Sequence, residues 1–397
     1  MSSGYILGAA GTACGRFPDA TVGSLAIQAL DGALEDAAVT ADRIEAIFFS
    51  NALSGLLTGQ ECVRGQVALR HSRYGGIPTV NVENACASGS TALHLACQAI
   101  IAGAYETVAV VGAEKMSHPD SRRPLRALEG AADVELLTDA PDDHSVFMDS
   151  YAERARGRVE RYGWQPADFA AVVVKNRRHA AHNPTAQYRS AMTVDEVLGS
   201  RMISAPLTLP MCCPIGDGAA ALVLAGTPNG IRVRASALSA TGGPRPGTVV
   251  QRSSAAAREQ SGLAADEVDV IEVHDATASA ELEAYEHLGL AGEGDGNRLI
   301  AEGRTALGGP LPVNTSGGLL SRGHPVGATG VFQIVELVAQ LRGRADGRQV
   351  DPAPTLALAQ NAGGFVEGDN AVAVVTILER RSRRTPRRPR DSRARRG

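Results

Sequence analysis

The sequence predicts an α/β protein made of two copies of one α/β unit, stacked as helix, sheet, shared helix layer, sheet and helix. Three observations support this five-layered fold class. The 397 residues exceed what one hydrophobic core usually holds. Hydrophobic residues make up 44% of the chain and charged residues 21%, as in ordinary globular proteins. A set of apolar strands around one long helix also occurs twice in the same order.

The elements of the repeat follow one another in matched order. Each copy has two strands, a helix and two further strands, and the strands are near-continuous apolar runs. Such runs are expected when helices cover both faces of a sheet. The elements lie at 43–51, 77–82, 88–102, 107–112 and 217–224 in the first copy, and at 268–274, 311–314, 327–341, 355–360 and 370–378 in the second.

The repeat also suggests how the chain is divided. The N-terminal half covers 1–116 plus 211–230, and the C-terminal half covers 231–379. The stretch 117–210 has no counterpart in the second half, so we expect an inserted loop domain over an active site. The end of the chain, 380–397, holds ten Arg against one Asp and is expected to be a disordered, solvated tail, with binding to RNA, a membrane surface or another subunit as the alternative.

Charge and composition exclude several classes of protein. The net charge of −4 combines a tail of +9 with a body of −13, and an acidic body argues against nucleic acid as the main partner. No apolar run approaches the roughly 18 residues of a membrane span, and no secretion signal is visible, so we expect a cytoplasmic protein. Apart from the adjacent Cys212 and Cys213, the six Cys are far apart, and no Cys-x-x-Cys pair occurs, which argues against a zinc site and a disulfide framework and leaves a nucleophile as one option.

The first chemical signal is a cysteine in a turn of small residues, 84–89, between a buried strand and a helix. Cys86 is expected at or just before the helix N-terminus, where free backbone N–H groups and the helix dipole favour a thiolate. Its small neighbours leave room for an acyl group. The alternative is a buried Cys that only fills a tight turn, and this packing role is assigned to Cys97, Cys212 and Cys213.

Two histidines follow strands of the second copy. His274 lies in 272–277, which reads Glu-Val-His-Asp-Ala-Thr, and His324 lies in 323–330, which reads Gly-His-Pro-Val-Gly-Ala-Thr-Gly. The repeat places both loops at the end of the structure where Cys86 lies. Cysteine with two imidazoles can form and discharge a thioester, because one imidazole accepts the thiol proton and both can donate to an oxyanion. Asp275 is expected to support its loop structurally.

These motifs and the duplicated unit resemble the thiolase superfamily over residues 4–379, and most closely its sterol-carrier-protein type. The resemblance implies that Cys86 accepts the acyl group and that His324 activates it. It implies that His274 and His324 bind one thioester oxygen, and that the backbone N–H groups of Cys86 and Gly363 bind the other. It also implies a coenzyme A or acyl-carrier thioester as substrate, no permanently bound cofactor or metal, a homodimer or homotetramer, and a CoA cleft under the inserted region.

Two thiols of the related enzymes are missing. Common thiolases carry a second Cys in a Cys-x-Gly loop near the C-terminus, where this chain has Asn361, here a candidate supporting residue. The sterol-carrier-protein type supplies that thiol from a His-Asp-Cys-Phe loop, where this chain has Ala276. Deprotonation of an acyl-CoA α-carbon therefore lacks its usual base, which puts ordinary thiolysis in question.

Several interpretations stay open. The protein is a decarboxylating Cys-His-His ketoacyl synthase, an enzyme that transfers the acyl group from Cys86 to an already activated carbon, or a thiolase in which water or His274 replaces the thiol. The altered loop also resembles thiolase-like proteins that bind a small OB-fold, zinc-ribbon subunit. A Schiff-base retro-aldolase is disfavoured because Lys115 and Lys175 lie outside these loops, and a non-catalytic scaffold would not need Cys86. We predict a homo-oligomeric acyltransferase that forms or cleaves a carbon–carbon bond.

Overall fold

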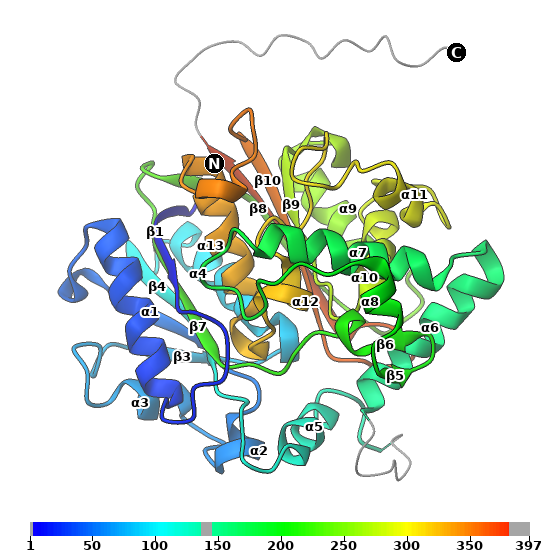
Figure 1. Ribbon diagram of the computed structural model, residues 1–397. Coiled ribbons are helices and arrows are strands. Elements are labelled where there is room, and N and C mark those ends of the chain that lie inside the picture. The colour runs from blue at the N-terminus through cyan, green and yellow to red at the C-terminus, as the bar shows by residue number, and fades with distance from the viewer. Residues whose placement is uncertain (1–2, 136–144, 381–397) are drawn as a thin grey trace.

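In the computed structural model, which describes residues 3–135 and 145–380, nine strands of the described chain form one mixed sheet (Figure 1). Their order is β3-β2-β4-β7-β1-β8-β11-β10-β9. A separate hairpin pairs β5 (Met202–Ser204) with β6 (Leu207–Thr208). The strands of the large sheet are β1 (Tyr5–Gly11), β2 (Ala46–Ser50), β3 (Thr79–Val82), β4 (Thr107–Glu114), β7 (Gly218–Ala225), β8 (Ile231–Ala240), β9 (Val270–Glu272), β10 (Leu356–Gly363) and β11 (Val372–Arg380).

The large sheet consists of two equivalent halves. They meet where β1 pairs with β8 through only two residue pairs, Tyr5 with Arg232 and Ile6 with Ile231. Counted toward the centre of the sheet, β2-β4-β7-β1 matches β9-β10-β11-β8, with the first pair parallel and the next two antiparallel. Beside β9, Val313 forms a parallel bridge in the place that β3 holds beside β2. The predicted duplication is therefore confirmed.

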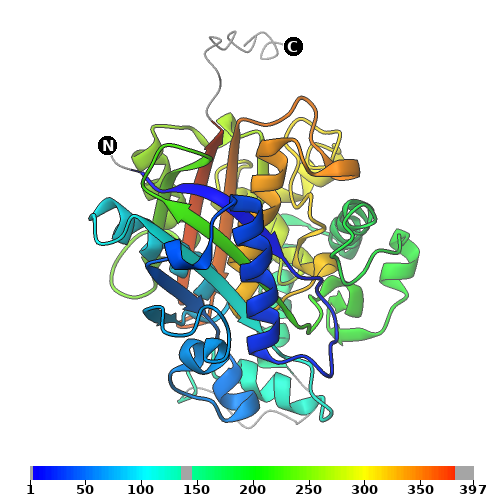
Figure 2. The ribbon, with the colours of Figure 1, turned by 90° about the vertical axis from the view of Figure 1, so that its left-hand side faces the viewer.

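Helices occupy three layers around the two half-sheets. The central helices α4 (Ser88–Ile101) and α13 (Thr329–Arg342) lie between the half-sheets and contact strands of both. On the outer faces, α1 (Val22–Ala37) packs on β1, β4 and β7, as the blue helix in front of the sheet in Figure 2 shows, and α9 (Val249–Ser261) packs on β8 and β11. These contacts give the five layers that the sequence predicted.

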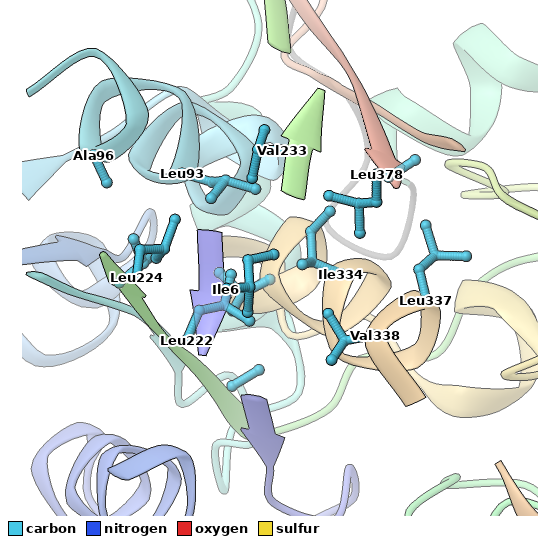
Figure 3. Close-up of a cluster of buried hydrophobic side chains, with 14 of the residues drawn as sticks. Ile6, Leu93, Ala96, Leu222, Leu224, Val233, Ile334, Leu337, Val338 and Leu378 are labelled. Carbon is cyan, nitrogen blue, oxygen red and sulfur yellow. The ribbon is translucent and has the colours of Figure 1, made fainter. Parts of the chain in front are cut away.

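The alternation of buried strand residues explains the apolar runs in the sequence. In β4, Val108 and Val110 belong to the central cluster. Figure 3 shows other members of this cluster, among them Leu222, Leu93 of α4 and Leu337 of α13. Their neighbours along the same strands belong to a second buried cluster under α1. Because both faces of each half-sheet are covered, neither face tolerates a regular row of polar residues.

The segment between β4 and β7 shares its core with the second half. It contains α5 (Arg122–Glu129), α6 (Val146–Tyr162), α7 (Pro166–Ala180) and α8 (Val194–Leu198). Phe169 and Val173 of α7 belong to the same buried cluster as Leu282 and Ile377, and α7 contacts α10 (Ala278–His287) and α12 (Gly318–Arg322). These contacts tie α7 to the second half of the protein. The prediction that this segment forms an inserted domain over the active site stays a prediction.

The remaining helices are short. They are α2 (Ser54–Thr58), α3 (Arg64–Leu69), α11 (Gly296–Ala301) and six 3₁₀ turns within the described residues, η1 (Ala41–Arg43), η2 (Ala85–Ala87), η3 (Leu209–Met211), η4 (Ala265–Glu267), η5 (Val326–Ala328) and η6 (Asp346–Arg348). Arg380, the first residue of the predicted tail, ends β11, and 381–397 lie outside the described residues. Across the described chain, every helix is too short or too polar to cross a bilayer.

Candidate active site

Cys86 lies in η2, the single 3₁₀ turn that leads into α4. The chain reverses sharply there, because Ala85 adopts a left-handed conformation with φ of 47°. Glu83 accepts the Ala85 N–H at 2.6 Å. The Ser88 hydroxyl donates to the Ala85 carbonyl at 2.6 Å and accepts the Asn84 N–H at 2.9 Å. These bonds fix the cysteine at the start of the helix.

The end of β10 approaches this turn so closely that only glycine fits. A Cβ atom on Gly363 would lie 2.3 Å from the Asn84 carbonyl oxygen and 2.6 Å from the Ala87 nitrogen. Two backbone N–H groups act on the Cys86 sulfur, those of Cys86 itself and of Gly364. The expectation from the sequence that the Gly363 N–H binds the thioester oxygen concerns a different atom and stays a prediction.

Burial keeps the nucleophile protonated in the free protein. Cys86 is 9% exposed, and this burial, followed by the charge of Glu114, raises the pKa of its thiol to about 12. The N–H groups of Cys86 and Gly364 lower the pKa but do not outweigh burial. The helix start therefore does not produce a resting thiolate, contrary to the expectation from the sequence, and the sulfur needs a base when it attacks.

His324 is placed to be that base. Its Nε2 lies 3.3 Å from the Cys86 Sγ, and its Nδ1 lies 2.7 Å from the Thr329 hydroxyl. Because that hydroxyl donates to the Pro325 carbonyl at 3.0 Å, it accepts a proton from Nδ1. His324 therefore carries its proton on Nδ1, which leaves Nε2 free to accept the thiol proton.

His274 is held in the opposite tautomer. The Asn361 side chain places its Nδ2 3.1 Å from the His274 Nδ1, where it donates, and the Gln360 side chain accepts the backbone N–H of His274 at 2.9 Å. The proton of His274 therefore sits on Nε2, the nitrogen suited to donate to a substrate oxygen. The rings of His274 and His324 meet edge to face, with centroids 5.2 Å apart.

A buried cation helps to keep both imidazoles neutral. Burial and the charge of Arg322 lower the pKa of His274 to about 3. Burial, His274 and Arg322 lower the pKa of His324 well below its usual 6.5. Arg322 is 2% exposed, stacks on the Phe332 ring at 4.9 Å and has no hydrogen-bond partner for its guanidinium among the described residues. Neutral thiol and neutral imidazoles thus form the resting site.

Carboxylates behind the site hold the histidine loops in place. Asp275 accepts the Leu319 N–H at 2.7 Å, the Leu320 N–H at 3.3 Å and the Asn176 side-chain amide at 2.9 Å. These bonds connect the His274 loop to α12, which leads into His324, and to α7. Asp275 therefore makes supporting contacts between the His274 loop, α12 and α7.

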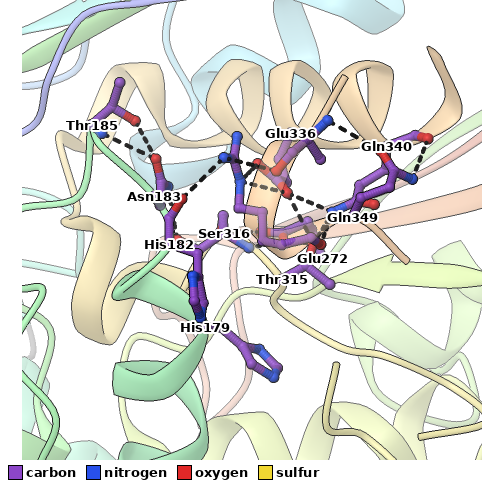
Figure 4. A network of polar contacts seen from close by, with 12 residues as sticks. His179, His182, Asn183, Thr185, Glu272, Thr315, Ser316, Glu336, Gln340 and Gln349 are labelled. Atoms are coloured by element: carbon purple, nitrogen blue, oxygen red, sulfur yellow. Dashed lines mark hydrogen bonds and ion pairs between the residues drawn. The ribbon is translucent and has the colours of Figure 1, made fainter. Parts of the chain in front are cut away.

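A second carboxylate network includes Glu272, the last residue of β9 (Figure 4). Glu272 accepts the Ser316 N–H at 3.0 Å and the Ser316 hydroxyl at 2.6 Å. The Thr315 hydroxyl and the Gln340 amide both donate to Glu336 at 3.0 Å. Burial and the neighbouring Glu336 raise the pKa of Glu272 to about 7. The network links β9 to α13 through the 315–316 loop.

Glu114, the last residue of β4, connects the two halves of the site. Its carboxylate accepts the backbone N–H of Gly327 at 2.9 Å, of Ala52 at 2.9 Å and of Leu53 at 3.2 Å. The Asn51 amide donates to it at 2.8 Å. The carboxylate therefore fixes η5, and with it the start of α13, against the first half.

The two lysines are held by partners of their own. Lys115 forms an ion pair with Asp217 at 3.0 Å. Lys175 forms an ion pair with Glu281 and donates to the Val313 carbonyl at 3.0 Å. Neither makes a contact with Cys86 or the two histidines among the interactions of the described chain.

The other cysteines differ in their surroundings. Cys97 belongs to the central core cluster and Cys212 to the cluster of the second half, as their predicted packing role requires. Cys213 is half-buried and outside these clusters, and its backbone N–H donates to the Ala276 carbonyl at 3.0 Å. A pure packing role therefore does not describe Cys213.

Sequence reasoning missed three residues of this site. Thr329 and Arg322 lie within the His324 motif and just before it, so their spacing to His324 was an available signal. Glu114 ends a strand of the other half, and nothing around it in the sequence indicates that it reaches Gly327. The sequence prediction of no metal remains a prediction, because the donor atoms of Cys86, His274 and His324 lie within 4.8 Å of one another and are of the kind that Zn²⁺ binds.

A reactive cysteine and two neutral imidazoles on a duplicated α/β fold define a site for acyl transfer. The chain matches family models for the thiolase N-terminal domain over residues 5–227 and for the thiolase C-terminal domain-like family over 232–380. The chain belongs to the thiolase family.

Curated relatives agree with this assignment. The benzoylsuccinyl-CoA thiolase subunit BbsB of Thauera aromatica is 33% identical over 82% of this chain and 86% of its own length. The acetyl-CoA acetyltransferase of Methanothermobacter thermautotrophicus is 36% identical over 90% and 96%. Sterol carrier protein 2 of Oryctolagus cuniculus is 37% identical over 79% of this chain, which spans only 61% of that protein.

Solved structures show the same fold. The Ltp2-ChsH2(DUF35) aldolase matches with a TM-score of 0.77 and 22% identity over 96% of this chain and 99% of that chain. The Acat5 thiolase of Ascaris suum in complex with coenzyme A matches with a TM-score of 0.67 and 18% identity over 95% and 99%. These matches confirm the predicted thiolase-like architecture.

Proposed function

We propose that this thiolase-family acyltransferase forms or cleaves a carbon–carbon bond through a thioester on Cys86, with an acyl-CoA as its substrate. The contact of 3.3 Å between the Cys86 Sγ and the His324 Nε2 carries the proposal. Relatives named a benzoylsuccinyl-CoA thiolase subunit and an acetyl-CoA acetyltransferase support the CoA thioester.

The first half-reaction follows from the two tautomers. His324 Nε2 takes the thiol proton as the Cys86 sulfur adds to the thioester carbonyl carbon. The backbone N–H groups of Cys86 and Gly363 are the proposed donors for the oxyanion that forms, and the Nε2–H of His274 serves the substrate oxygen of the second half-reaction. When the carbon–sulfur bond to CoA breaks, the CoA sulfur leaves with the proton from His324, and the acyl group remains on Cys86.

In the second half-reaction the acyl group passes to a carbon nucleophile. The resemblance leaves the origin of that nucleophile open, because position 276 is Ala and position 361 is Asn. A malonyl-type thioester would provide it by decarboxylation, an activated acceptor would bring it ready-made, and an acetyl-CoA would need a base. Product analysis with acetyl-CoA and malonyl-CoA offered separately distinguishes these routes.

The assembly of the protein is part of the same proposal. We propose a cytoplasmic homo-oligomer that also binds a small partner subunit. The partner is supported by two names, since one relative is called a thiolase subunit and one structural neighbour joins two proteins, Ltp2 and ChsH2(DUF35). Light scattering of the purified chain tests the homo-oligomer, and the mass of a single chain would contradict it.

Intact-mass measurement after incubation with a panel of acyl-CoAs tests the central step. We expect a mass increase of one acyl group, and its absence from the Cys86→Ala variant. Cys62→Ala is the matched control, because Cys62 is exposed and outside the site. An adduct that persists in Cys86→Ala, or no adduct with any acyl-CoA, would contradict the proposal.

A further inference from the structure

The proposed chemistry needs a group that exchanges a proton with the α-carbon, and the two positions that hold this thiol in related enzymes carry Ala276 and Asn361. Asn361 cannot transfer the proton, and its Nδ2 is engaged with His274. Its Oδ1 is buried without a hydrogen-bond partner, so this amide supplies no proton donor for the α-carbon. A side chain that borders Ala276 is therefore the best placed to supply one.

A short antiparallel pairing brings Cys213 to this place. Cys212 forms a β-bridge with Thr277, and the Cys213 N–H donates to the Ala276 carbonyl at 3.0 Å. In this register Cys213 stands directly opposite Ala276. Side chains directly opposite each other on antiparallel segments have Cβ atoms about 4.5 to 5.5 Å apart.

The faces of this pairing separate the two neighbouring cysteines. Cys212 packs into the cluster of the second half with Leu282 and Val273. Because successive side chains of an extended segment point to opposite faces, Cys213 and Ala276 share the other face. A thiol at position 276 would therefore stand on the same face as the Cys213 sulfur and opposite it.

The surroundings of the Cys213 thiol agree with a place beside the reaction centre. Ala276, which Cys213 stands opposite, lies two residues from His274. Burial raises the pKa of the Cys213 thiol well above its usual 9.0, and Cys212, Cys86 and Asp275 raise it further. Its thiol is protonated in the resting protein, which suits a group that donates a proton.

We propose that Cys213 is the acid/base residue of the second half-reaction and takes the role of the missing thiol from the facing segment. This inference rests on the proposed acyl-Cys86 chemistry and names the group that the sequence could not supply. It assigns a catalytic role to a residue that the sequence indicated as packing only.

The cleavage direction shows how the protons balance. The Cys86 sulfur, its proton taken by His324, adds to the 3-keto carbon of a 3-ketoacyl-CoA. The C2–C3 bond breaks, its electron pair goes to C2, and C2 takes the proton of Cys213, which releases acetyl-CoA and leaves the shortened acyl group on Cys86. Free CoA then gives its thiol proton to the Cys213 thiolate and attacks the acyl group. The Cys86 thiolate leaves and recovers its proton from His324.

Deuterium exchange into the α-carbon of acetyl-CoA tests this assignment. We expect exchange by the native protein and a loss of about 10²- to 10⁴-fold in Cys213→Ala, the usual contribution of a positioned acid/base. Formation of acetyl-Cys86, measured by intact mass, does not use the Cys213 proton and is expected to persist. Cys213→Ser keeps the size of the side chain and is expected to lose exchange as well.

The decisive variant moves the thiol from position 213 to position 276 on the opposite segment. In Cys213→Ala combined with Ala276→Cys, the sulfur returns to the same volume from the opposite segment, and we expect exchange to recover. A purely structural Cys213 would not be rescued in this way. Cys97→Ala, at a buried cysteine away from the site, is the control for loss of a buried thiol.

Three outcomes would overturn the assignment while the acyl-Cys86 proposal stands, provided that acetyl-Cys86 forms. They are exchange at the native rate in Cys213→Ala, no exchange by the native protein, and loss in Tyr151→Phe instead. Tyr151 is the competing donor, because its hydroxyl also lies within electrostatic range of Cys86 and Cys213. If the native protein forms no acetyl-Cys86 with acetyl-CoA but does with another acyl-CoA, that acyl-CoA replaces it as the probe.

Discussion

The two central helices begin alike and carry different chemistry. A single 3₁₀ turn leads into each, and residues 85–89 before and within α4 align with 326–330 before and within α13. Both helices open with a hydroxyl residue followed by glycine. The alignment pairs Cys86 with Gly327, so duplication placed two equivalent helix starts face to face and only one of them acquired a nucleophile.

The strand ends that meet these helix starts differ in the same way. Glu114 ends β4 and accepts the Gly327 N–H at 2.9 Å, so a carboxylate of the protein already occupies the start of α13. Gly363 ends the equivalent strand β10 and brings no side chain to Cys86. Among the described residues no carboxylate accepts the Cys86 N–H. One helix start is therefore filled by a fixed anion, and the other is open to a substrate oxygen.

The largest expected effect concerns the base that the second half supplies. His324→Ala should slow acylation of Cys86 by about 10²- to 10⁴-fold, because a neutral buried thiol then has no acceptor for its proton. His274→Ala should leave acylation largely intact and block transfer of the acyl group to the acceptor. Single-turnover kinetics with intact-mass detection separates the steps, and equal defects in both steps would refute this division of roles.

The hydroxyl residues that open the two helices provide a sharper test. Thr329→Val should slow acylation by up to about 10²-fold, because His324 loses the acceptor that fixes its tautomer and orientation. Ser88→Ala, at the equivalent position, should cost about 1 kcal/mol of unfolding free energy, as a lost hydrogen bond does, with a smaller effect on acylation.

Thr329→Ser keeps the hydroxyl and should restore most of the rate. Chemical denaturation measured beside the acylation rate keeps the two kinds of effect apart. If Thr329→Val lost only stability, or if Thr329→Ser failed to recover the rate, the tautomer of His324 would not depend on this contact.

The glycines at the second position of each helix test how closely the halves must meet. A Cβ on Gly330 would lie 2.5 Å from the Ser90 backbone nitrogen, so the helices would have to separate. A Cβ on Gly89 would meet Val331 at 3.0 Å, where a smaller shift suffices. Gly330→Ala should lower the unfolding free energy by about 1 to 3 kcal/mol, and Gly89→Ala by less. Equal losses of unfolding free energy would show that the two helix starts are packed equally tightly.

Most of the fold could be predicted from the sequence because the same pattern of buried residues occurs in both copies of the α/β unit. The strands of both copies are covered on both faces, so they stand out as apolar runs, and their order can be matched between the copies from the residues alone. The contribution of α7 could not be predicted, since it has no repeat partner. Its Asn176 supports Asp275 across a large sequence separation, and such a contact leaves no local pattern.

In the site, the reacting residues could be predicted from the sequence, but their protonation states could not. Cys86, His274 and His324 follow strands of a recognisable repeat, so topology brings them together. Their charge state depends on burial and on Arg322 and Glu114, which are set by the packing of both halves. Cys213 was missed for a similar reason, because its position opposite Ala276 is a pairing between distant segments.

The smallest expected effect is a flat pH profile for acylation, and it tests whether the open helix start forms a thiolate. Burial raises the pKa of Cys86 to about 12 and lowers the pKa of His324 well below 6.5. Between these values the thiol is protonated and the imidazole is an unprotonated base, so the reactive pair is fully present. The rate should fall only when acid protonates His324, and it should not rise as pH passes the usual thiol value of 9.0.

Acylation of Cys86 followed by intact mass from about pH 5 to about pH 9 spans the range in which an ordinary His or Cys would titrate. A rise across the upper part of this range would mean that the thiolate is the attacking species, and that the start of α4 acts on the sulfur more strongly than burial does.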